Sequence, residues 1–486
     1  MLMRLSKNTF VRQYGPFTYV LGRIKSYDQM FSDAEVFFRW ITRSPLERDV
    51  IIDNICSVYV GVTRDDIAHD FDEFFAPLIA EKIVLVGGTP GELDAQEESF
   101  SYDVANPKTM DTHRIRPEEM HEGAVPQDVL QEYFAQHPTI FELQIDVTQA
   151  CTERCIHCYI PEYNPVFLPF DQITKVIDEF REQGGVELSL SGGECMLHPQ
   201  FDEIVRYARS KDLIVSILSN LTLCDDAKVK ILQEAEATVQ VSLYSMRPET
   251  HDAITKRPGS FAETKSAIEK LRKAQIPCRI SCPTMKPNYH DYLDVLAYAR
   301  SIQMDAQTDF VIMGKMDCDT SNLACRLDLK ETRSILEDIV FKSVPMNSEY
   351  FDPRKKNDMR SPKEWMESKI CGACVSSVCL DATGNYYPCP AFGGVSLGSC
   401  YEHDLNWVWT KSPETLQMRA ITGRDFPKCA HCEDRDYCSV CMCRNYNETG
   451  DMFKESPHFC AVAKLNHKVV DELHEKIRRT HETGKK

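Results

Sequence analysis

The hydrophobic and polar positions between residues 140 and 343 alternate in two periods. Short runs rich in β-branched residues predict strands, and each is followed by a longer stretch with helical spacing, such as FDQITKVIDEFREQ or FAETKSAIEKLRKAQ. The six runs are FELQIDVT, VELSLSG, LIVSILSN, TVQVSLYS, CRISCPTM and QTDFVIM. Because these runs are nearly continuous in apolar residues, we expect a parallel sheet covered by helices through right-handed crossovers.

Six strand–helix units are fewer than the eight of a complete barrel. The pattern therefore predicts an α/β domain over residues 137–345 that forms a partial (β/α)6 TIM-like barrel, open on one side. Parallel α/β sheets place their active sites beyond the carboxyl ends of the strands. We therefore expect the chemistry in the loops that follow the strands.

Residues 1–95 read as a strand, FTYVLGR, three helices and a final strand, KIVLVGG. We expect the first helix to open at Ser32, because Glu35 stands three residues on and completes a capping box. The third should run from Thr63 with one apolar face on a core, formed by Ile67, Phe71, Phe74 and Leu78. This order of elements predicts a small winged-helix α+β module that binds a partner and has no chemistry of its own.

Residues 96–136 are polar, with scattered Pro and Gly, and are predicted to be a linker. From residue 346 to 486 the regular alternation stops, and cysteines, glycines and aromatic residues take over before a final amphipathic helix at about 461–480. We expect this cysteine-rich domain to bury little apolar surface, so that bound metal supplies part of its folding energy.

The net charge of −18, with no basic run, argues against a nucleic-acid partner, since a phosphate backbone would be repelled. A basic or neutral peptide fits this charge better. No apolar stretch reaches the roughly 18 residues needed to cross a bilayer, and the amino terminus has no signal-peptide pattern, which predicts a cytoplasmic protein.

The chain has 21 cysteines, which a reducing cytoplasm would use for metal binding rather than for disulfides. Most of them cluster in residues 151–158, 371–400 and 429–460. We interpret the scattered remainder as small buried hydrophobic residues, namely Cys56, Cys195, Cys224, Cys278, Cys282, Cys318 and Cys325.

The first cluster, CTERCIHCY, follows the first barrel strand and so should lie at the mouth of the barrel. A structural zinc site uses four ligands, and the only extra ligand nearby is His157, which we expect to point away. Three thiolates suit three irons of a [4Fe–4S] cluster and leave the fourth iron for an exogenous ligand. We therefore predict that Cys151, Cys155 and Cys158 hold such a cluster.

The CxxxCxxC spacing followed by an aromatic residue resembles the signature of radical S-adenosylmethionine (SAM) enzymes, and the resemblance extends through the barrel. It implies that SAM chelates the open iron and is cleaved to methionine and a 5′-deoxyadenosyl radical. SGGE matches the GGE motif of the family, and SN, VSLYS and RPGSF match later positions. The resemblance implies these SAM-binding residues: Gly192, Gly193, Glu194, Ser219, Asn220 and Ser242.

The carboxyl-terminal stretches CGACVSSVCLDATGNYYPC and CAHCEDRDYCSVCMC resemble the SPASM domain, which carries two auxiliary iron–sulfur clusters in peptide-modifying radical SAM enzymes. One cluster would take Cys429, Cys432, Cys438 and Cys460. The spacing after Cys438 departs from that of the family, so the other ligand set stays less certain. It would take Cys371, Cys389 and Cys441 with Cys443, and the alternatives for the last ligand are Cys379, Cys374 or an open iron. A zinc ribbon over residues 429–443 is the competing interpretation.

The amino-terminal module is similar to the precursor-peptide recognition element of ribosomal peptide pathways, which binds a leader as an added strand. Together the resemblances imply a maturase of a ribosomal precursor peptide, served by a reductant such as flavodoxin or ferredoxin. We expect a thioether from a cysteine sulfur to a carbon, in the manner of sactipeptide and ranthipeptide enzymes. The alternatives are carbon–carbon crosslinking, peptide-derived cofactor biogenesis, epimerisation, and a non-enzymatic iron–sulfur or zinc regulator.

Overall fold

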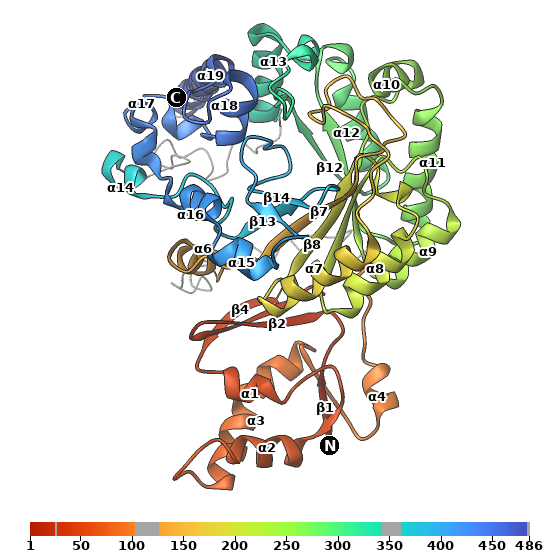
Figure 1. The fold of residues 1–486 in the computed structure, drawn as a ribbon, viewed down its shortest axis with the longest axis vertical. Coiled ribbons are helices and arrows are strands. Elements are labelled where there is room, and N and C mark those ends of the chain that lie inside the picture. Colours follow the sequence, from red (N-terminus) through yellow and green to blue (C-terminus); the bar gives the residue numbers. More distant parts are fainter. Residues whose placement is uncertain (25–26, 103–125, 343–360, 484–486) are drawn as a thin grey trace. The chain divides into compact units, whose positions relative to one another are not determined.

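The computed structural model describes residues 1–24, 27–102, 126–342 and 361–483 (Figure 1). The chain divides into two compact units, Met1–Gln136 and His137–Lys486. The predicted boundary between the barrel and the cysteine-rich domain, at 345, falls outside the described residues. No described helix is both long and apolar enough to cross a membrane.

The amino-terminal unit holds two antiparallel sheets of three strands each. One has the order β5-β1-β6, with β5 (Leu46–Glu47), β1 (Leu2–Leu5) and β6 (Val84–Gly87). The other has the order β2-β3-β4, with β2 (Thr9–Tyr14), β3 (Phe17–Gly22) and β4 (Tyr27–Ser32). Sequence analysis found β3 and β6 and missed the other four, which are short or rich in polar residues.

The helices of this unit are α1 (Glu35–Arg39), α2 (Arg48–Cys56), α3 (Arg64–Ala80), α4 (Pro90–Asp94) and α6 (Pro126–Gln136). The capping box predicted at Ser32 is wrong, because Ser32 ends β4 and α1 has no side-chain cap. A capping box forms at Thr63, where its side chain and that of Asp66 bond reciprocally at the start of α3. The predicted linker of 96–136 contains α6, which belongs to this unit.

The core of the unit forms around α3, whose inward face carries Ile67, Phe71, Phe75 and Leu78. The predicted stripe is therefore confirmed except at Phe74, which is only partly buried while Phe75 is fully buried. Phe71 and Phe75 pack against each other with ring centroids 4.6 Å apart. Phe75 also packs on Phe38 of α1, and Phe74 packs on Phe31 of β4, so that aromatic contacts fix α3 against its neighbours.

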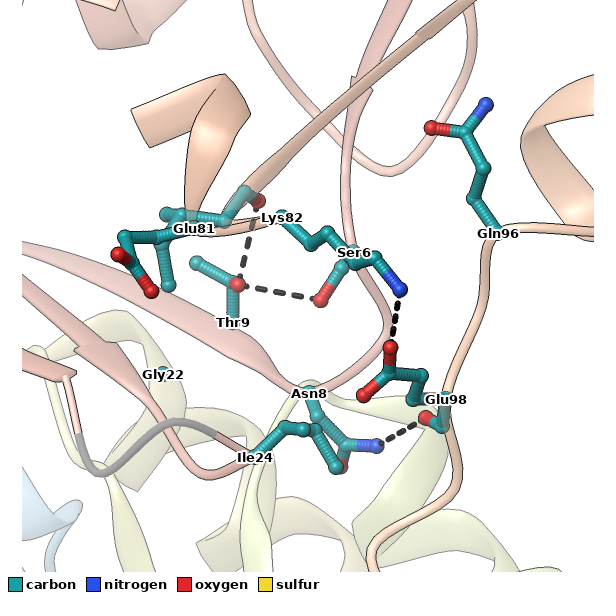
Figure 2. Close-up of a pocket in the computed structure, with 10 residues that line it drawn as sticks. Ser6, Asn8, Thr9, Gly22, Ile24, Glu81, Lys82, Gln96 and Glu98 are labelled. Atoms are coloured by element: carbon teal, nitrogen blue, oxygen red, sulfur yellow. Dashed lines mark hydrogen bonds and ion pairs between the residues drawn. The ribbon is translucent and has the colours of Figure 1, made fainter. Parts of the chain in front are cut away.

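Figure 2 shows a pocket of this unit beside the turn between β1 and β2. Its walls are tied together by polar contacts: Thr9 Oγ1 donates to the carbonyl oxygen of Ile83 at 3.2 Å, and Asn8 Nδ2 donates to that of Glu98 at 3.1 Å. Lys82 and Glu98 form an ion pair across it. The cavity of about 20 Å³ has room for about one water molecule, so it is too small for a peptide side chain.

The second unit is built on a nine-stranded sheet with the order β12-β11-β10-β9-β8-β7-β13-β14-β15. Strands β7 to β12 are the predicted parallel strands, in sequence order: β7 (Glu142–Thr148), β8 (Glu187–Gly192), β9 (Ile214–Ser219), β10 (Thr238–Ser242), β11 (Cys278–Pro283) and β12 (Asp305–Asp309). The partial six-stranded barrel is thus confirmed. Its last strand begins and ends earlier than the predicted run QTDFVIM.

Helices cover the outside of this curved sheet, as Figure 1 shows for α7 to α12. They are α7 (Phe170–Glu182), α8 (Phe201–Ser210), α9 (Asp226–Glu234), α10 (Pro248–Thr255), α11 (Ser260–Lys273), α12 (Tyr292–Ser301) and α13 (Leu329–Lys342). Most of them bury an apolar stripe, such as Ile173, Val176, Ile177 and Phe180 of α7, whereas α10 buries His251 and Thr255 beside Ile254. The amphipathic helices of the sequence pattern are confirmed.

The two faces of the barrel sheet differ in polarity, which corrects the expectation of nearly continuous apolar strands. The helix-covered face holds fully buried residues such as Ile145, Leu190 and Val241. The alternate positions face the inside, here called the lumen, and are mostly polar. They include Gln144, Asp146, Ser189, Ser216, Gln240, Ser242 and Ser281.

The cysteine-rich part joins the barrel directly. Strand β13 (Ser377–Leu380) pairs in parallel with β7, with Cys379 opposite Gln144, and is followed by β14 (Asn385–Tyr387) and β15 (Gly398–Ser399). The helices are α14 (Pro362–Glu367), α15 (Leu405–Thr410), α16 (Pro413–Ala420), α17 (Pro427–Ala430), α18 (Met442–Thr449) and α19 (Pro457–Thr483).

This part also has an apolar core of its own. Tyr386, Phe392 and Phe426 are fully buried, together with Leu397 and Leu405. The expectation that it buries little apolar surface is therefore wrong, because short helices and turns bring aromatic residues together without a long periodic element. Bound metal is not the only source of its folding energy.

Candidate active site

The cysteine loop, residues 151–158, follows β7 and is fixed from two sides. On one side, the backbone N–H of Arg154 donates to the carbonyl oxygen of Thr255 at 2.9 Å, at the end of α10. On the other, the buried amide of Asn322 donates to the carbonyl oxygen of Cys158 at 3.3 Å. These bonds hold a loop without regular structure in one conformation.

Polar side chains reach the sulfurs of this loop. Cys155 Sγ lies 3.3 Å from Glu153 Oε2, and Tyr244 Oη lies 3.7 Å from the same sulfur. Asn220 Nδ2 lies 3.9 Å from Cys151 Sγ. The three predicted ligands of the loop are thus electrostatic neighbours inside one partly buried site.

Burial dominates the protonation of this site. It raises the pKa of the Cys151 thiol to about 12 and that of the Glu153 carboxyl to about 7. Burial also lowers the pKa of His157 to about 4. Thiols buried next to a carboxyl group ionise only when a cation compensates them, as a metal centre does.

Two buried polar atoms of the loop have no hydrogen-bond partner within the described chain: Glu153 Oε1 and His157 Nδ1. His157 packs edge-on against Tyr244, with ring centroids 5.2 Å apart. A bound polar group at this position would give these two atoms hydrogen-bond partners. The three thiols beside it are soft ligands that suit iron. The loop therefore fits an iron–sulfur cluster with a polar ligand.

The glycine pair at the end of β8 packs against the cysteine loop. A Cβ on Gly192, where φ is +122°, would lie 2.2 Å from the carbonyl oxygen of Thr148, and one on Gly193 would lie 2.3 Å from that of Ala150. The N–H of Gly193 donates to Thr148 at 2.9 Å. These glycines are required for the close approach of two backbones, while their predicted contact with SAM stays a prediction.

Glu194 is fully buried and holds the turn that follows β9. Its Oε1 accepts from Ser219 Oγ at 2.8 Å and from the N–H of Met196 at 3.0 Å, and its Oε2 accepts from the N–H of Asn220 at 2.8 Å. The next residue, Leu221, has a left-handed φ of 63°, which a leucine adopts only under constraint. Glu194 thus positions Ser219 and Asn220 near the cysteine loop.

The predicted RPGSF loop is organised by one carboxylate. Asp252 of α10 accepts from the N–H of Gly259 at 2.6 Å and from that of Phe261 at 2.9 Å. Arg257 Nη1 reaches back to the carbonyl oxygen of Thr152 at 3.4 Å. Ser242 ends β10 and faces the lumen. All the predicted SAM-site residues therefore surround one end of the barrel.

Residues 145–299 match the Radical SAM superfamily. The barrel is a radical SAM domain. Enzymes of this superfamily use a [4Fe–4S] cluster and SAM, and the cysteine loop lies within the matched range.

Two curated relatives resemble this chain over about two thirds of its length. The AdoMet-dependent heme synthase of Methanosarcina barkeri is 26% identical over 64% of this chain and 94% of its own. The antilisterial bacteriocin subtilosin biosynthesis protein AlbA of Bacillus subtilis is 24% identical over 64% of this chain and 69% of its own.

A solved structure resembles the fold over nearly the whole chain. Streptococcus suis SuiB, crystallised with its precursor peptide SuiA, covers 94% of this chain and 99% of its own, with a TM-score of 0.59 and 14% identity. A match of that extent includes most of the amino-terminal unit as well as the radical SAM domain.

The first predicted auxiliary ligand set converges beside the radical SAM domain. The thiol of Cys443 lies close enough to the sulfurs of Cys389 and Cys441 to interact with both. The neighbouring Cys443 thiol, and then Arg444, lower the pKa of Cys441 to about 5. Cys371 lies close enough to Cys441 and Cys389 to interact with them electrostatically, and Cys379 neighbours Cys389. The structure thus brings together the favoured four cysteines and leaves Cys379 adjacent.

The second predicted set also gathers in one place. Cys429 interacts electrostatically with Cys432, Cys438 and Cys460, and burial raises its pKa to about 12. Cys432 and Cys460 are exposed at the surface. Among the described residues, no group of three or more Cys, His, Asp or Glu side chains is arranged to hold a single metal ion.

The scattered cysteines behave as predicted, except for two. Cys195, Cys224, Cys278, Cys282 and Cys325 are buried, whereas Cys56 and Cys318 are only partly buried.

Several residues at these sites carry no motif and were missed by sequence analysis. Asn322 holds the cysteine loop from a distant 3₁₀ turn, and no local pattern marks it. Tyr244 lies in the quoted VSLYS stretch, although only Ser242 was chosen there. Asp146 faces the lumen and accepts from Gln144 Nε2 at 2.8 Å, and burial raises its pKa to about 7. A polar residue at alternate positions of β7 could have indicated it.

Proposed function

We propose that the chain is a radical SAM maturase of a ribosomally synthesised peptide, and that it forms an intramolecular thioether between a cysteine sulfur and a carbon. One observation carries most weight. A cavity of about 150 Å³ is lined by lumen residues of the barrel, such as Gln144 and Ser189, and also by Cys389 of the first auxiliary set. The cavity lies at the amino-end halves of β7 and β8, at the opposite end of these strands from the cysteine loop, and so connects the lumen with the first auxiliary set.

Within this proposal, Cys151, Cys155 and Cys158 hold the SAM-binding cluster, and the two carboxyl-terminal sets hold auxiliary clusters. When bound, the SAM-binding cluster supplies the electron that generates the 5′-deoxyadenosyl radical. The chain's own residues bind and orient SAM and the peptide. Glu194 and Asn220 shape the SAM site, and the polar lumen offers hydrogen-bonding groups to a peptide backbone.

The thioether step balances if two hydrogens leave the peptide. SAM, when bound, would supply the radical that removes one hydrogen atom from a peptide carbon and leaves as 5′-deoxyadenosine. The cysteine S–H bond breaks, its proton leaves to solvent or a base, and the S–C bond forms. One surplus electron must then leave the product, and an auxiliary cluster is the proposed acceptor. A flavodoxin or ferredoxin is the proposed source of the electron that cleaves SAM.

The amino-terminal unit is proposed to bind the leader of the precursor. Strand β4 lies at an edge of its sheet, with Phe31 of the strand packed on Phe74 of α3 at 5.1 Å between ring centroids. An edge strand can accept a peptide as a further strand. The likeness to SuiB, which was crystallised with a precursor peptide, supports this role because it extends over the unit.

Deleting residues 1–136, the whole amino-terminal unit, tests the leader role directly. The truncated chain should still cleave SAM reductively, but it should bind a leader-bearing peptide at least tenfold more weakly, which is about 1.4 kcal/mol. Fluorescence anisotropy with a labelled precursor measures the affinity. If the affinity is unchanged, the leader does not bind this unit.

Tandem mass spectrometry of the product tests the bond. With a cognate precursor, each crosslink should remove two hydrogens, and the modified cysteine should no longer react with iodoacetamide. A Cys→Ala precursor should not be crosslinked. A product two hydrogens lighter whose cysteines still alkylate would instead support carbon–carbon crosslinking or cofactor biogenesis. An unchanged mass with an inverted α-carbon would support epimerisation.

The likeness to AdoMet-dependent heme synthase favours a second candidate, a tetrapyrrole substrate. That relative matches nearly its whole length to about two thirds of this chain, so about a third of this chain lies outside the match. Incubation of the protein with an iron-bearing tetrapyrrole and SAM distinguishes the tetrapyrrole candidate from the peptide candidate. Its conversion, without conversion of any peptide, would overturn the peptide proposal.

A further inference from the structure

The turn between α2 and α3 exposes a group of large apolar side chains (Figure 1). Val60 is 98% exposed, and Val58, Tyr59 and Val62 are 43%, 41% and 48% exposed. These four are among eleven large apolar side chains that are exposed in the described part of the chain, and the other seven are scattered. Single exposed apolar residues are ordinary, whereas a group of them marks an interaction site. Residues 58–62 are called the apolar tip below.

The apolar tip is held in one conformation by hydrogen bonds at both ends. At the end of α2, the N–H of Val58 donates to the carbonyl oxygen of Ile55 at 3.0 Å. At the start of α3, Thr63 and Asp66 form the capping box. Between them Gly61 has a left-handed φ of +83°, which a glycine adopts without strain. Because this turn is already ordered, it loses little conformational entropy when a partner binds.

Carboxylates flank the apolar tip along both helices. The two arginines of residues 48–73 are already paired with two of these carboxylates, Arg48 with Asp72 and Arg64 with Asp53. The segment has seven acidic residues, all exposed: Asp49, Asp53, Asp65, Asp66, Asp70, Asp72 and Glu73. Acidic residues therefore outnumber the arginines by five, and the apolar tip stands in a negative field.

The charge of this surface decides between the possible partners. In a symmetric contact between two copies of the chain, the same patch meets itself, so two acidic surfaces would come together. An anionic membrane surface would be repelled for the same reason. A peptide segment that combines apolar side chains with lysine or arginine has the complementary character. The precursor peptide is the partner that the proposed function brings to this unit.

The apolar tip and the edge strand β4, where the leader is proposed to bind, are connected through α3. Phe74 of α3 packs on Phe31 of β4, with ring centroids 5.1 Å apart. Arg64 begins α3 and precedes Phe74 by ten positions, which is about 15 Å along a helix. An extended peptide spans this distance with about five residues. A precursor bound as a strand at β4 would therefore reach the apolar tip with a short neighbouring segment.

We propose that the apolar tip and its acidic flanks form a second docking surface for the precursor peptide, which takes a segment with apolar and basic side chains. The inference rests on the proposed function, in which the amino-terminal unit binds the precursor. Contacts with Tyr59 and Val60 supply affinity, because aromatic and apolar anchors carry most of the binding energy of an interface. The carboxylates speed association and make its rate depend on salt.

The test of the apolar contacts uses the full-length protein and a fluorescein-labelled cognate precursor, with fluorescence anisotropy as the measure of affinity. The variant is Tyr59→Ser with Val60→Ser. Its matched control is Leu293→Ser, at an exposed leucine of α12. Thermal unfolding checks that the variants keep their fold. We expect the double variant to bind the precursor roughly tenfold more weakly, and the control to bind it as the wild-type protein does.

The test of the carboxylates measures the association rate of the same labelled precursor by stopped flow, at low and at high salt. Asp65→Asn with Asp70→Asn removes two charges and leaves the capping box of Asp66 in place. Glu132→Gln, at an exposed position of α6, is the matched control. We expect the double variant to associate more slowly at low salt and to lose part of the salt dependence, while the control keeps both. Unchanged affinity after the apolar substitutions, or unchanged salt dependence after the acidic ones, would overturn the inference.

Two further measurements separate this inference from the proposed function. If deletion of residues 1–136 leaves precursor affinity unchanged, the leader role of the unit is wrong and this inference with it. If the deletion weakens binding but the Tyr59→Ser, Val60→Ser variant does not, only the role of the apolar tip is wrong. Light scattering gives the oligomeric state. A wild-type dimer that this variant converts to a monomer would assign the apolar tip to a contact between copies, and would overturn the inference.

Discussion

The cysteine loop and the auxiliary sets solve the same problem, gathering thiols in one place, in opposite ways. In the loop, three cysteines stand within residues 151–158, and the barrel only has to hold that segment still through bonds such as that of Asn322. The first auxiliary set draws Cys371, Cys389 and Cys441 from segments far apart in sequence. The loop depends on its support, whereas the auxiliary sets depend on the fold of the domain.

The sharpest way to separate the two regions is to remove the ligands of the loop. The Cys151→Ala, Cys155→Ala, Cys158→Ala protein should form no 5′-deoxyadenosine, because SAM would lose its cluster. It should keep the iron of the auxiliary sets. Chromatographic assay of deoxyadenosine and iron analysis measure both. Complete loss of iron would contradict the independence of the two regions.

The converse change removes ligands from the second auxiliary set. Cys429→Ala with Cys432→Ala should lose one cluster and abolish peptide crosslinking, because the surplus electron loses its acceptor. SAM cleavage in the absence of peptide should continue at a comparable rate. Iron content, deoxyadenosine yield and product mass are the measurements. Normal crosslinking by this variant would show that the second set is not needed for the reaction.

A smaller effect is expected at Glu194, which follows β8 and holds the turn after β9. In the wild-type protein, the hydroxyl of Ser219 and the N–H of Asn220 donate to the carboxylate of Glu194. In Glu194→Gln, one of these donors would face an amide NH2, which cannot accept a hydrogen bond. An unpaired buried donor costs about 1–3 kcal/mol, so SAM should bind about tenfold or more weakly. Isothermal titration measures this, and Glu187→Gln at the start of β8, the strand that precedes Glu194, is the control. Equal SAM affinity in both variants would show that Glu194 does not shape the SAM site.

The smallest expected effect is a change of stability with pH, caused by Asp146 in the lumen. Burial raises the pKa of Asp146 from 3.8 to about 7, so the folded state holds this proton more tightly than the unfolded chain. The stability from this group is therefore present below about pH 4 and is lost as pH rises through 7.

In the metal-free protein, the free energy of unfolding should consequently fall between pH 5 and pH 8, and Asp146→Asn should reduce that fall. Denaturant unfolding at both values measures it. Asp171→Asn, at an exposed position of α7, should leave the fall unchanged. The same fall in Asp146→Asn as in wild type would remove Asp146 from the explanation.

Local sequence patterns were enough to predict the barrel and the cysteine loop. Five of the six barrel strands begin within one residue of the predicted runs, because buried strands keep an apolar face whatever they pair with. The strands β13 to β15 were missed. They are short, and β13 is stabilised by pairing with β7, which its own sequence does not reveal.

The residues of the candidate site also divide into those that a local sequence pattern predicts and those that only the fold reveals. The cysteines and the glycine pair were found because their spacing is fixed by local chemistry. Asn322 was missed, because it acts on a segment that only the fold brings near. At Glu194 the motif gave the residue, while the structure adds a role that the motif does not contain: its bonds hold the turn after β9.

The parallel pairing of β13 with β7 makes the cysteine-rich part inseparable from the barrel in practice. If the chain were cut near residue 345, the backbone N–H and C=O groups of β7 that now face β13 would become an open, apolar edge of a sheet. Such an edge invites the addition of strands from other molecules, and so aggregation. Exchange of this part between relatives by domain shuffling would therefore have to transplant the β7 interface along with it.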